Sequence, residues 1–360
     1  MALIEQGHDV AFNCLKWPEI AMPLRRLIDA GARPYFRSRL RMGRSLRRAF
    51  EEMRLLRLRF VRWIHNVKPD LVVISFALHT DDPQIANTCR ALGVPYAILL
   101  QAAGPSNWIP PRSLDVFRSA YATAEQCFFV SAENRDIVES NLAIDLCRAE
   151  IADNPFSVRV DAAPTWPSTE PVWKLACVGR INFAAKSQDL LLRVLRSPKW
   201  RTRPLKVSMW GEDHGNLNQV RHLIALYGLE QQVCYEGYAR DIEGLWSEHH
   251  ALLLPSRFEG NPLAMIEAML CGRIPIVTNV GRAAELVDDN ESGFVAPAAT
   301  VELVDDALER AWQRRHDWQL MGQRAAIAIR ERHSLRPAQD FAVRLLELAH
   351  RSASAVRSVA

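Results

Sequence analysis

Two glutamates eight positions apart, Glu259 and Glu267, lie where this 360-residue sequence most favours chemistry. They belong to the stretch 251–280, which reads ALLLPSRFEGNPLAMIEAMLCGRIPIVTNV. Its apolar pattern predicts a buried strand at 252–254, a loop that carries Glu259, and a helix that starts at Pro262 and carries Glu267. A strand followed by a polar loop and a helix N-terminus is the geometry in which open α/β sheets bind anionic ligands.

A simpler interpretation of the two glutamates stays open at this point. Glu259 could cap the N-terminus of the helix, and Glu267 could be an exposed helix residue. The neighbours of Glu267 within 265–269 are apolar, which favours burial. A buried carboxylate needs a charged or hydrogen-bonding partner.

A second charged pattern follows the strand expected at 173–178. Gly179 and Arg180 come directly after it, and Lys186 stands six residues beyond Arg180. A glycine lets the backbone turn tightly, and the two cations could meet an anion. Taken alone, the pattern is weak and is better explained by two cations on the surface.

The segment RFEGNPLAMIEAMLCGRIPIV, with the Pro-Ser before it, resembles the Glu-x7-Glu signature of retaining glycosyltransferases of family 4, also described as glycosyl transferases group 1. These enzymes have the GT-B architecture, an α/β fold in which two Rossmann-like domains face a cleft. The resemblance implies that Glu259 faces the donor sugar and that Glu267 holds the ribose hydroxyls of the nucleotide. It also implies that Arg180 and Lys186 clamp the diphosphate.

The resemblance extends to a full set of site residues. It implies catalytic roles for Arg180, Lys186 and Glu259. On the acceptor side, Gln101 and Asn107 follow the strand expected at 94–100. The implied donor-binding residues are Gly179, Arg180, Lys186, Glu259, Gly260, Asn261, Leu263 and Glu267.

The reaction implied by this resemblance moves a hexose from a nucleotide-diphosphate sugar to a hydroxyl acceptor, with the anomeric configuration retained. The acceptor is a glycan, a lipid-linked sugar or a small molecule. Many relatives carry a cleft-facing histidine where this chain has Gln101. An amide can hydrogen-bond sugar hydroxyls, but it is not an acid or base near neutral pH. The leaving phosphate is thought to help deprotonate the acceptor in such enzymes.

We expect no metal and no other cofactor, since the nucleotide sugar is a co-substrate. The paired acids at 81–82, 288–289 and 305–306 are typical of turns or helix surfaces rather than of a metal-binding Asp-x-Asp. Two alternatives to a glycosyltransferase remain. One is a nucleotide-sugar epimerase of GT-B shape, and the other is a relative that binds a nucleotide sugar without turnover.

Strands alternate with helices along the chain, which predicts parallel sheets. We expect an acceptor-side domain at 1–163, a linker at 164–172, a nucleotide-sugar domain at 173–335, and a helix at 336–360 that crosses back to the first domain. The first residues resemble the end of a helix, a Gly7 cap and a strand at 10–12. We therefore expect the first strand of the N-terminal domain to be missing, with the chain starting inside its first helix.

The region between Leu24 and Lys68 holds fourteen Arg and Lys against three acids, although the whole chain has a formal charge of only +4. It lacks the alternation of a strand. From Leu46 onward apolar residues recur at helical spacing, with arginines around them. This spacing predicts a helix, for which two interpretations stay open. It is a surface helix with a solvated basic face, or its residues 46–62 form a patch that rests on anionic membrane lipid. No recognised module accompanies the charge, so we expect no nucleic-acid partner. The apolar residues of this stripe are Leu46, Phe50, Met53, Leu56, Phe60 and Ile64, and the arginines are 47, 48, 54, 57, 59 and 62.

The apolar runs, the N-terminus and the cysteines of the sequence indicate the cellular compartment of the protein. No apolar run approaches the ~20 residues that cross a bilayer, and no secretory signal is visible. The seven cysteines are scattered and include no Cys-x-x-Cys pair, which indicates reduced thiols. We therefore expect a cytoplasmic protein, with peripheral contact on the inner face of the membrane as an option.

Overall fold

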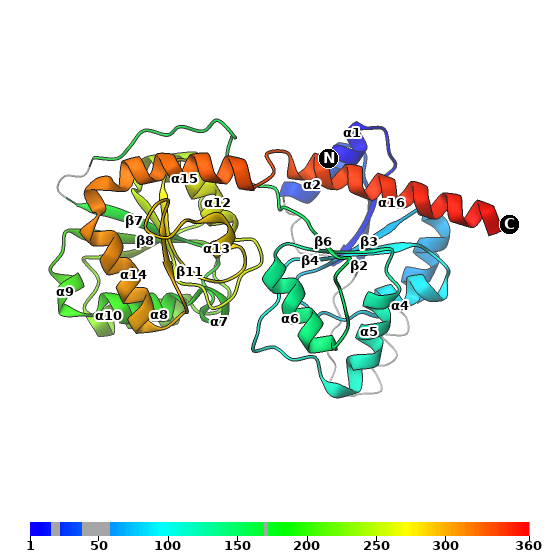
Figure 1. Cartoon of the computed structure of the whole chain (residues 1–360), viewed down its shortest axis with the longest axis horizontal. Coiled ribbons are helices and arrows are strands. Elements are labelled where there is room, and N and C mark those ends of the chain that lie inside the picture. The colour runs from blue at the N-terminus through cyan, green and yellow to red at the C-terminus, as the bar shows by residue number, and fades with distance from the viewer. Residues whose placement is uncertain (16–21, 38–57, 169–171, 360) are drawn as a thin grey trace.

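The computed structural model describes residues 1–15, 22–37, 58–168 and 172–359. The strands of these residues fall into two groups that lie apart in Figure 1, with the strands after residue 172 at the left and the earlier ones at the right. The long helix α16 (Pro337–Val359), drawn in red, runs from the middle of the molecule across the right-hand group.

The first group contains two parallel sheets. One pairs β1 (Ala11–Leu15) with β2 (Arg33–Arg37), and the other has the order β3-β4-β5-β6. The strands of the larger sheet are β3 (Val72–Phe76), β4 (Tyr96–Leu100), β5 (Gln126–Phe129) and β6 (Glu150–Ile151). Besides the helical residues 58–67, the described helices of this group are α1 (Ala2–Glu5), α2 (Met22–Asp29), α4 (Gln84–Ala91), η1 (Pro111–Ser113), α5 (Leu114–Ala122) and α6 (Ala132–Leu142).

The second group is one parallel sheet of six strands in the order β12-β11-β10-β7-β8-β9. Its strands are β7 (Trp173–Val178), β8 (Leu205–Trp210), β9 (Val233–Gly237), β10 (Ala251–Leu254), β11 (Ile274–Thr278) and β12 (Phe294–Ala296). Its helices are α7 (Phe183–Lys186), α8 (Gln188–Leu195), α9 (Pro198–Arg201), α10 (Leu217–Tyr227), α11 (Ile242–Glu248), α12 (Leu263–Leu270), α13 (Ala283–Leu286), α14 (Val301–Gln313), η2 (Arg315–Asp317) and α15 (Trp318–Arg332).

The strands β10 and β11 of the second sheet are covered on both faces, which explains their apolar sequences. Every residue of β10 and β11 is buried, as expected for central strands of a parallel sheet. The predicted strand at 252–254, helix from Pro262 and following strand are confirmed as β10, α12 and β11. Pro262 is the N-cap residue of α12.

The strand β2 corrects the expectation that 24–66 contains no strand. It forms because β1 offers a parallel partner, with Arg33 ion-paired to Asp9. The rings of Phe36 and Phe12 also meet edge to face, 6.2 Å apart. These contacts come from outside the segment, so local alternation did not reveal them.

Most of the basic stripe lies outside the described residues, including its positions 46–57. Residues 58–67 are helical, and Phe60 and Ile64 are buried in the core of the first group. Arg59 and Arg62 are exposed on this helix. In this part the apolar positions therefore pack on protein, and no described helix is long and apolar enough to cross a membrane.

The helix α16 packs on the sheet of the first group. Phe341 meets Phe128 of β5 edge to face at 5.0 Å, and Leu345 and Leu348 are buried in a cluster with Ala97 and Phe128. The chain thus returns from the second sheet to the first, while the domain boundaries themselves stay a prediction.

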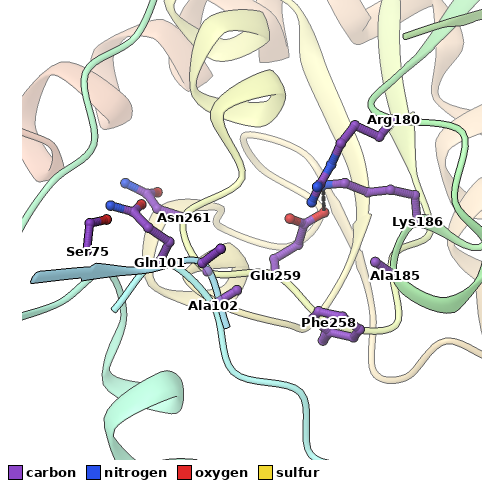
Figure 2. A pocket seen from close by; sticks show the side chains of 11 residues that line it. Ser75, Gln101, Ala102, Arg180, Ala185, Lys186, Phe258, Glu259 and Asn261 are labelled. Carbon is purple, nitrogen blue, oxygen red and sulfur yellow. Dashed lines mark hydrogen bonds and ion pairs between the residues drawn. The ribbon is translucent and has the colours of Figure 1, made fainter. Parts of the chain in front are cut away.

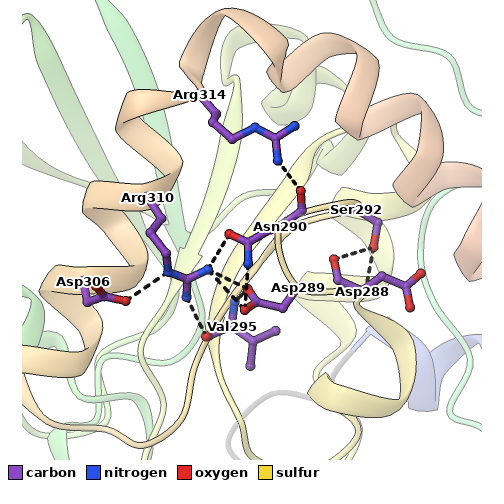
Figure 3. Close-up of polar contacts among 8 residues, drawn as sticks. All are labelled: Asp288, Asp289, Asn290, Ser292, Val295, Asp306, Arg310 and Arg314. Atoms are coloured by element: carbon purple, nitrogen blue, oxygen red, sulfur yellow. Dashed lines mark hydrogen bonds and ion pairs between the residues drawn. The ribbon is translucent and has the colours of Figure 1, made fainter.

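The connection from β11 to β12 is held by Arg310 of α14 and by Arg314, the C-cap residue of that helix (Figure 3). Arg310 donates to Asp289 at 2.9 Å and to Asn290 at 2.7 Å, and it also pairs with Asp306. Arg314 donates to the carbonyl oxygen of Asn290. These contacts fix the edge of the sheet, and they show that Asp289 and Asp306 serve ion pairs within the fold.

Candidate active site

A cavity of about 290 Å³ lies between the two groups of strands. Figure 2 shows its lining, with Arg180 and Lys186 reaching toward Glu259 and with Gln101 and Asn261 at the opposite end of the view. The first group contributes Ser75, Ala77, Gln101 and Ala102, and the second contributes Arg180, Ala185, Lys186, Phe258, Glu259, Gly260 and Asn261.

Each functional side chain of the cavity follows the C-terminal end of a parallel strand. Gln101 comes directly after β4, Arg180 follows β7, and Glu259 lies between β10 and α12. Lys186 is the last residue of α7, the short helix after β7. Ligands of open α/β sheets bind at this edge, so the topology itself gathers these residues.

Lys186 and Glu259 form a close ion pair. The Lys186 Nζ donates to Glu259 Oε1 at 2.5 Å, and the hydroxyl of Ser256 donates to the same oxygen at 2.6 Å. The Lys186 and Glu259 side chains are only 15% and 9% exposed. The cavity therefore presents a paired cation and anion, while Arg180 adds positive charge.

Arg257 holds this arrangement together, although the sequence analysis gave it no role. Its guanidinium binds Asp189 through two hydrogen bonds of 2.9 Å and donates to the carbonyl oxygen of Phe183 at 2.5 Å. Its backbone N–H donates to the carbonyl of Ala185 at 2.8 Å. The loop of Glu259 is thus tied to the helix of Lys186. The sequence feature that could have indicated this role is the charge of Arg257, two positions before Glu259.

Glu267 is buried but does not line the cavity. It is 6% exposed, and its Oε1 accepts from the backbone N–H of Ser157 at 2.9 Å. Burial raises the pKa of Glu267, and the hydrogen bonds from Ser157 oppose that rise. The simpler interpretation of both glutamates is wrong, because Glu267 is not exposed and α12 is capped at Pro262 rather than by Glu259.

Two glycines allow close approach of backbones at the cavity. A Cβ on Gly260 would lie 1.9 Å from the carbonyl oxygen of Gln101, so only glycine permits this contact between the two groups of strands. The backbone bends at Gly179, but its φ is not positive. Gly211 has φ of +144°, and a Cβ there would lie 2.0 Å from the Gly179 oxygen. The position at which only glycine fits is therefore Gly211.

The other predicted residues lie beside the cavity rather than on its lining. Leu263 is the first residue of α12. The Asn107 carbonyl oxygen lies 2.6 Å from Nε2 of the buried His79, and burial lowers the pKa of that histidine. The Asn107 amide packs against Gly104.

Two residues of α6 reach across to the second group, and sequence reasoning missed both. The Asn134 side chain is fully buried and donates to the carbonyl oxygen of Glu259 at 2.9 Å. The Glu133 carboxylate accepts from the N–H of Gly281, and burial raises its pKa. Nothing in the local sequence marks these residues, because their partners are more than a hundred positions away.

Comparisons with known proteins show what part of this chain is similar to. Residues 173–314 match the family described as "Glycosyl transferases group 1". Over 147 residues the chain is 31% identical to the D-inositol 3-phosphate glycosyltransferase of Saccharomonospora viridis. This alignment covers 38% of this chain and 34% of that protein. The chain spans about a third or less of the length of the curated relatives it matches.

Solved structures resemble the fold over almost the whole chain. A glycosyltransferase from Rickettsia africae aligns with a TM-score of 0.74 and 15% identity, covering 97% of this chain and 92% of that one. The Anabaena protein Alr3699/HepE in complex with UDP aligns with a TM-score of 0.73 and 15% identity, covering 94% and 100%. The chain therefore has the GT-B fold of glycosyltransferases, as predicted.

Proposed function

We propose that this chain is a retaining glycosyltransferase of family 4, which transfers a hexose from a nucleotide-diphosphate sugar to a hydroxyl acceptor. One observation carries the proposal: Arg180, Lys186 and Glu259, whose types and spacing resemble the family signature, meet in one cavity. All three lie within the residues 173–314 that match the glycosyltransferase family. The UDP bound by the Anabaena protein of the same fold supports a nucleotide donor.

In this proposal the positive side chains stabilise the leaving diphosphate. Negative charge grows on the phosphates as the sugar–phosphate bond breaks, and donors that are already in place stabilise it. A lysine ammonium has three N–H donors, so Lys186 can keep its bond to Glu259 and still meet a phosphate oxygen. Arg180 supplies the second cation, and Glu259 faces the sugar.

The same charges underlie the proposal that no metal and no other cofactor takes part. Two cations can offset the diphosphate charge that a divalent ion would otherwise screen. Among the residues the structure describes, no group of three His, Cys, Asp or Glu side chains is arranged to hold a metal ion. The test is turnover in EDTA, which should equal turnover with added Mg²⁺.

The acceptor side of the cavity is uncharged. Ser75, Ala77, Gln101 and Ala102 line it, and the Gln101 Oε1 accepts from the Asn154 amide at 3.0 Å. We propose a neutral hydroxyl acceptor, deprotonated with help from the leaving phosphate, because Gln101 cannot act as a base. The proposal includes a role in polysaccharide biosynthesis in the cytoplasm, with contact to anionic membrane through 46–62.

The experiment begins with thermal shifts for UDP-, GDP- and ADP-sugars. The donor that stabilises the protein is then incubated with and without candidate glycan acceptors, and both nucleotide release and the anomer of the product are measured. Release that requires an acceptor and yields a retained anomer supports the proposal. Nucleotide release without acceptor indicates an epimerase, and binding without release indicates a binding protein; either result refutes the proposal.

A further inference from the structure

Asn134, in the first turn of α6, makes its polar contact outside its own group of strands. The residue is fully buried, and its Nδ2 donates to the carbonyl oxygen of Glu259 at 2.9 Å. Its Oδ1 is also buried and has no hydrogen-bond partner among the residues that the structure describes. A buried polar atom without a partner destabilises a fold, so an amide at this position calls for an explanation beyond packing.

A second asparagine of α6, Asn141, shows what a purely local role looks like. Its Nδ2 donates to the carbonyl oxygen of Ile137 at 3.1 Å, and its Oδ1 accepts from the backbone N–H of Ile109 at 3.1 Å. The first group of strands and its helices therefore satisfy both polar groups of Asn141. The contrast indicates that Asn134 serves the loop of the second group rather than the packing of its own helix.

The backbone that follows Glu259 is enclosed on several sides. A Cβ on Gly260 would collide with the carbonyl oxygen of Gln101, and a Cβ on Gly281 would collide with the carbonyl oxygen of Gly260. The N–H of Gly281 is in turn held by the Glu133 carboxylate. The first turn of α6 therefore bonds both to the loop of Glu259 and to the turn that packs against this loop.

The Glu259 carbonyl and carboxylate belong to one residue, so a bond that fixes the first restrains the second. The carboxylate accepts from Lys186 Nζ at 2.5 Å and from the Ser256 hydroxyl at 2.6 Å. Figure 2 shows it directed toward Lys186. A displacement of about 1 Å in a positioned group can cost about a hundredfold in rate. The hydrogen bond from Asn134 can therefore influence turnover without any contact to a substrate.

We propose that Asn134 is a positioning residue, whose hydrogen bond to the Glu259 carbonyl keeps the Glu259 carboxylate where turnover requires it. Asn134 does not line the cavity, so it acts through Glu259. The effect on turnover rests on the proposed function, whereas the hold on the loop rests on the contacts themselves. The loop on the donor side of the cavity is thus set by both groups of strands.

The first test needs no ligand. Hydrogen–deuterium exchange of residues 256–261 is followed by mass spectrometry in the wild type, in Asn134→Ala and in the matched control Asn141→Ala. Exchange of this loop should be about threefold to tenfold faster in Asn134→Ala, the worth of one hydrogen bond, and unchanged in Asn141→Ala. Equal exchange in the wild type and Asn134→Ala, or an equal rise in the control, would overturn the proposal.

The second test measures binding and turnover separately. Calorimetry with the nucleotide diphosphate chosen from UDP, GDP and ADP by thermal shift gives the affinity and the fraction of competent protein. Asn134→Ala should keep the affinity within about twofold, because Arg180 and Lys186 remain. Turnover per competent site should fall about tenfold to a hundredfold. Asn141→Ala should change neither quantity by more than about twofold. Unchanged turnover in Asn134→Ala, or an equal loss in the control, would refute the positioning role.

A double-mutant cycle determines whether the effect passes through Glu259. In Glu259→Ala no carboxylate is left to position, so adding Asn134→Ala should lower the residual turnover by less than about twofold. If the double variant instead lost turnover by the product of the two single losses, Asn134 would act by another route and the proposal would be overturned.

The exchange and turnover measurements separate this proposal from the proposed function. If the wild type turns over no nucleotide sugar, the proposed function fails and the effect on turnover fails with it. The exchange rates of residues 256–261 still decide whether Asn134 holds the loop. If the wild type is active and Asn134→Ala matches it in exchange and turnover, the proposed function stands and the positioning role is refuted.

Discussion

Lys186→Met tests the centre of the site, because the contribution of the Lys186–Glu259 pair to stability and its contribution to turnover can be measured separately in this variant. The change keeps an unbranched side chain but removes the ammonium that donates to Glu259 Oε1 at 2.5 Å. Only the Ser256 hydroxyl, at 2.6 Å, then remains on that oxygen. The carboxylate of Glu259, 9% exposed, loses its counter-charge.

The expected cost follows from that burial. Removing one partner of a fully buried pair costs about 3–5 kcal/mol. Water in the adjoining cavity can solvate part of the carboxylate, so we expect the unfolding free energy to fall by about 1.5–3 kcal/mol, the worth of a hydrogen bond to a charged group. Turnover should fall about tenfold to a thousandfold, as for the loss of one transition-state donor.

The double variant Lys186→Met/Glu259→Gln makes the reasoning refutable. It leaves neither charge unpaired, so urea unfolding should show most of the lost stability restored. Turnover should stay at or below that of Lys186→Met. If the double variant lost as much unfolding free energy as the two single variants together, an unpaired charge would not be the cause of the instability. Lys199→Met is the control, because Lys199 pairs with Asp305 at 2.7 Å away from the cavity. It should cost about 0–1 kcal/mol and leave turnover unchanged.

Three further predictions concern other parts of the chain. Glu267→Gln should leave the far-UV circular dichroism unchanged and weaken UDP binding about tenfold, since a hydrogen bond to a charged group is worth about 1.5–3 kcal/mol; unchanged affinity would exclude the ribose role. Burial lowers the pKa of His250 from 6.5 to about 4, so between these values the unfolded chain binds more protons and the unfolding free energy falls as pH falls. The variant His250→Gln should remove up to about 1.4 kcal/mol per pH unit from that slope in urea titrations, and an identical slope would contradict the assignment. Finally, if 46–62 rests on lipid, co-sedimentation with liposomes should grow with anionic lipid content and fade with salt, whereas binding that ignores both would leave the arginines as a solvated face.

The sequence by itself determined the elements around the cavity, and it predicted three of the residues that line it. Apolar runs that are buried on both faces predict parallel strands whatever their neighbours, so β10 and β11 were recognisable from local pattern. Arg180, Lys186 and Glu259 were predicted because their types and spacing resemble a family signature. In a parallel sheet the C-terminal strand ends share one edge, which brings the three residues to one cavity.

Only the tertiary structure decided the contacts between segments distant in sequence. Asn134 reaches the carbonyl of Glu259, and His333 reaches Asn261, through pairs that leave no periodic or compositional signal. The strand β2 likewise depends on β1 rather than on its own residues. The burial of Glu267 against Ser157 has the same origin. Hydrophobic periodicity reports which face of an element is buried, but a hydrogen bond across the fold depends on how the elements pack, and that packing is not written in either segment alone.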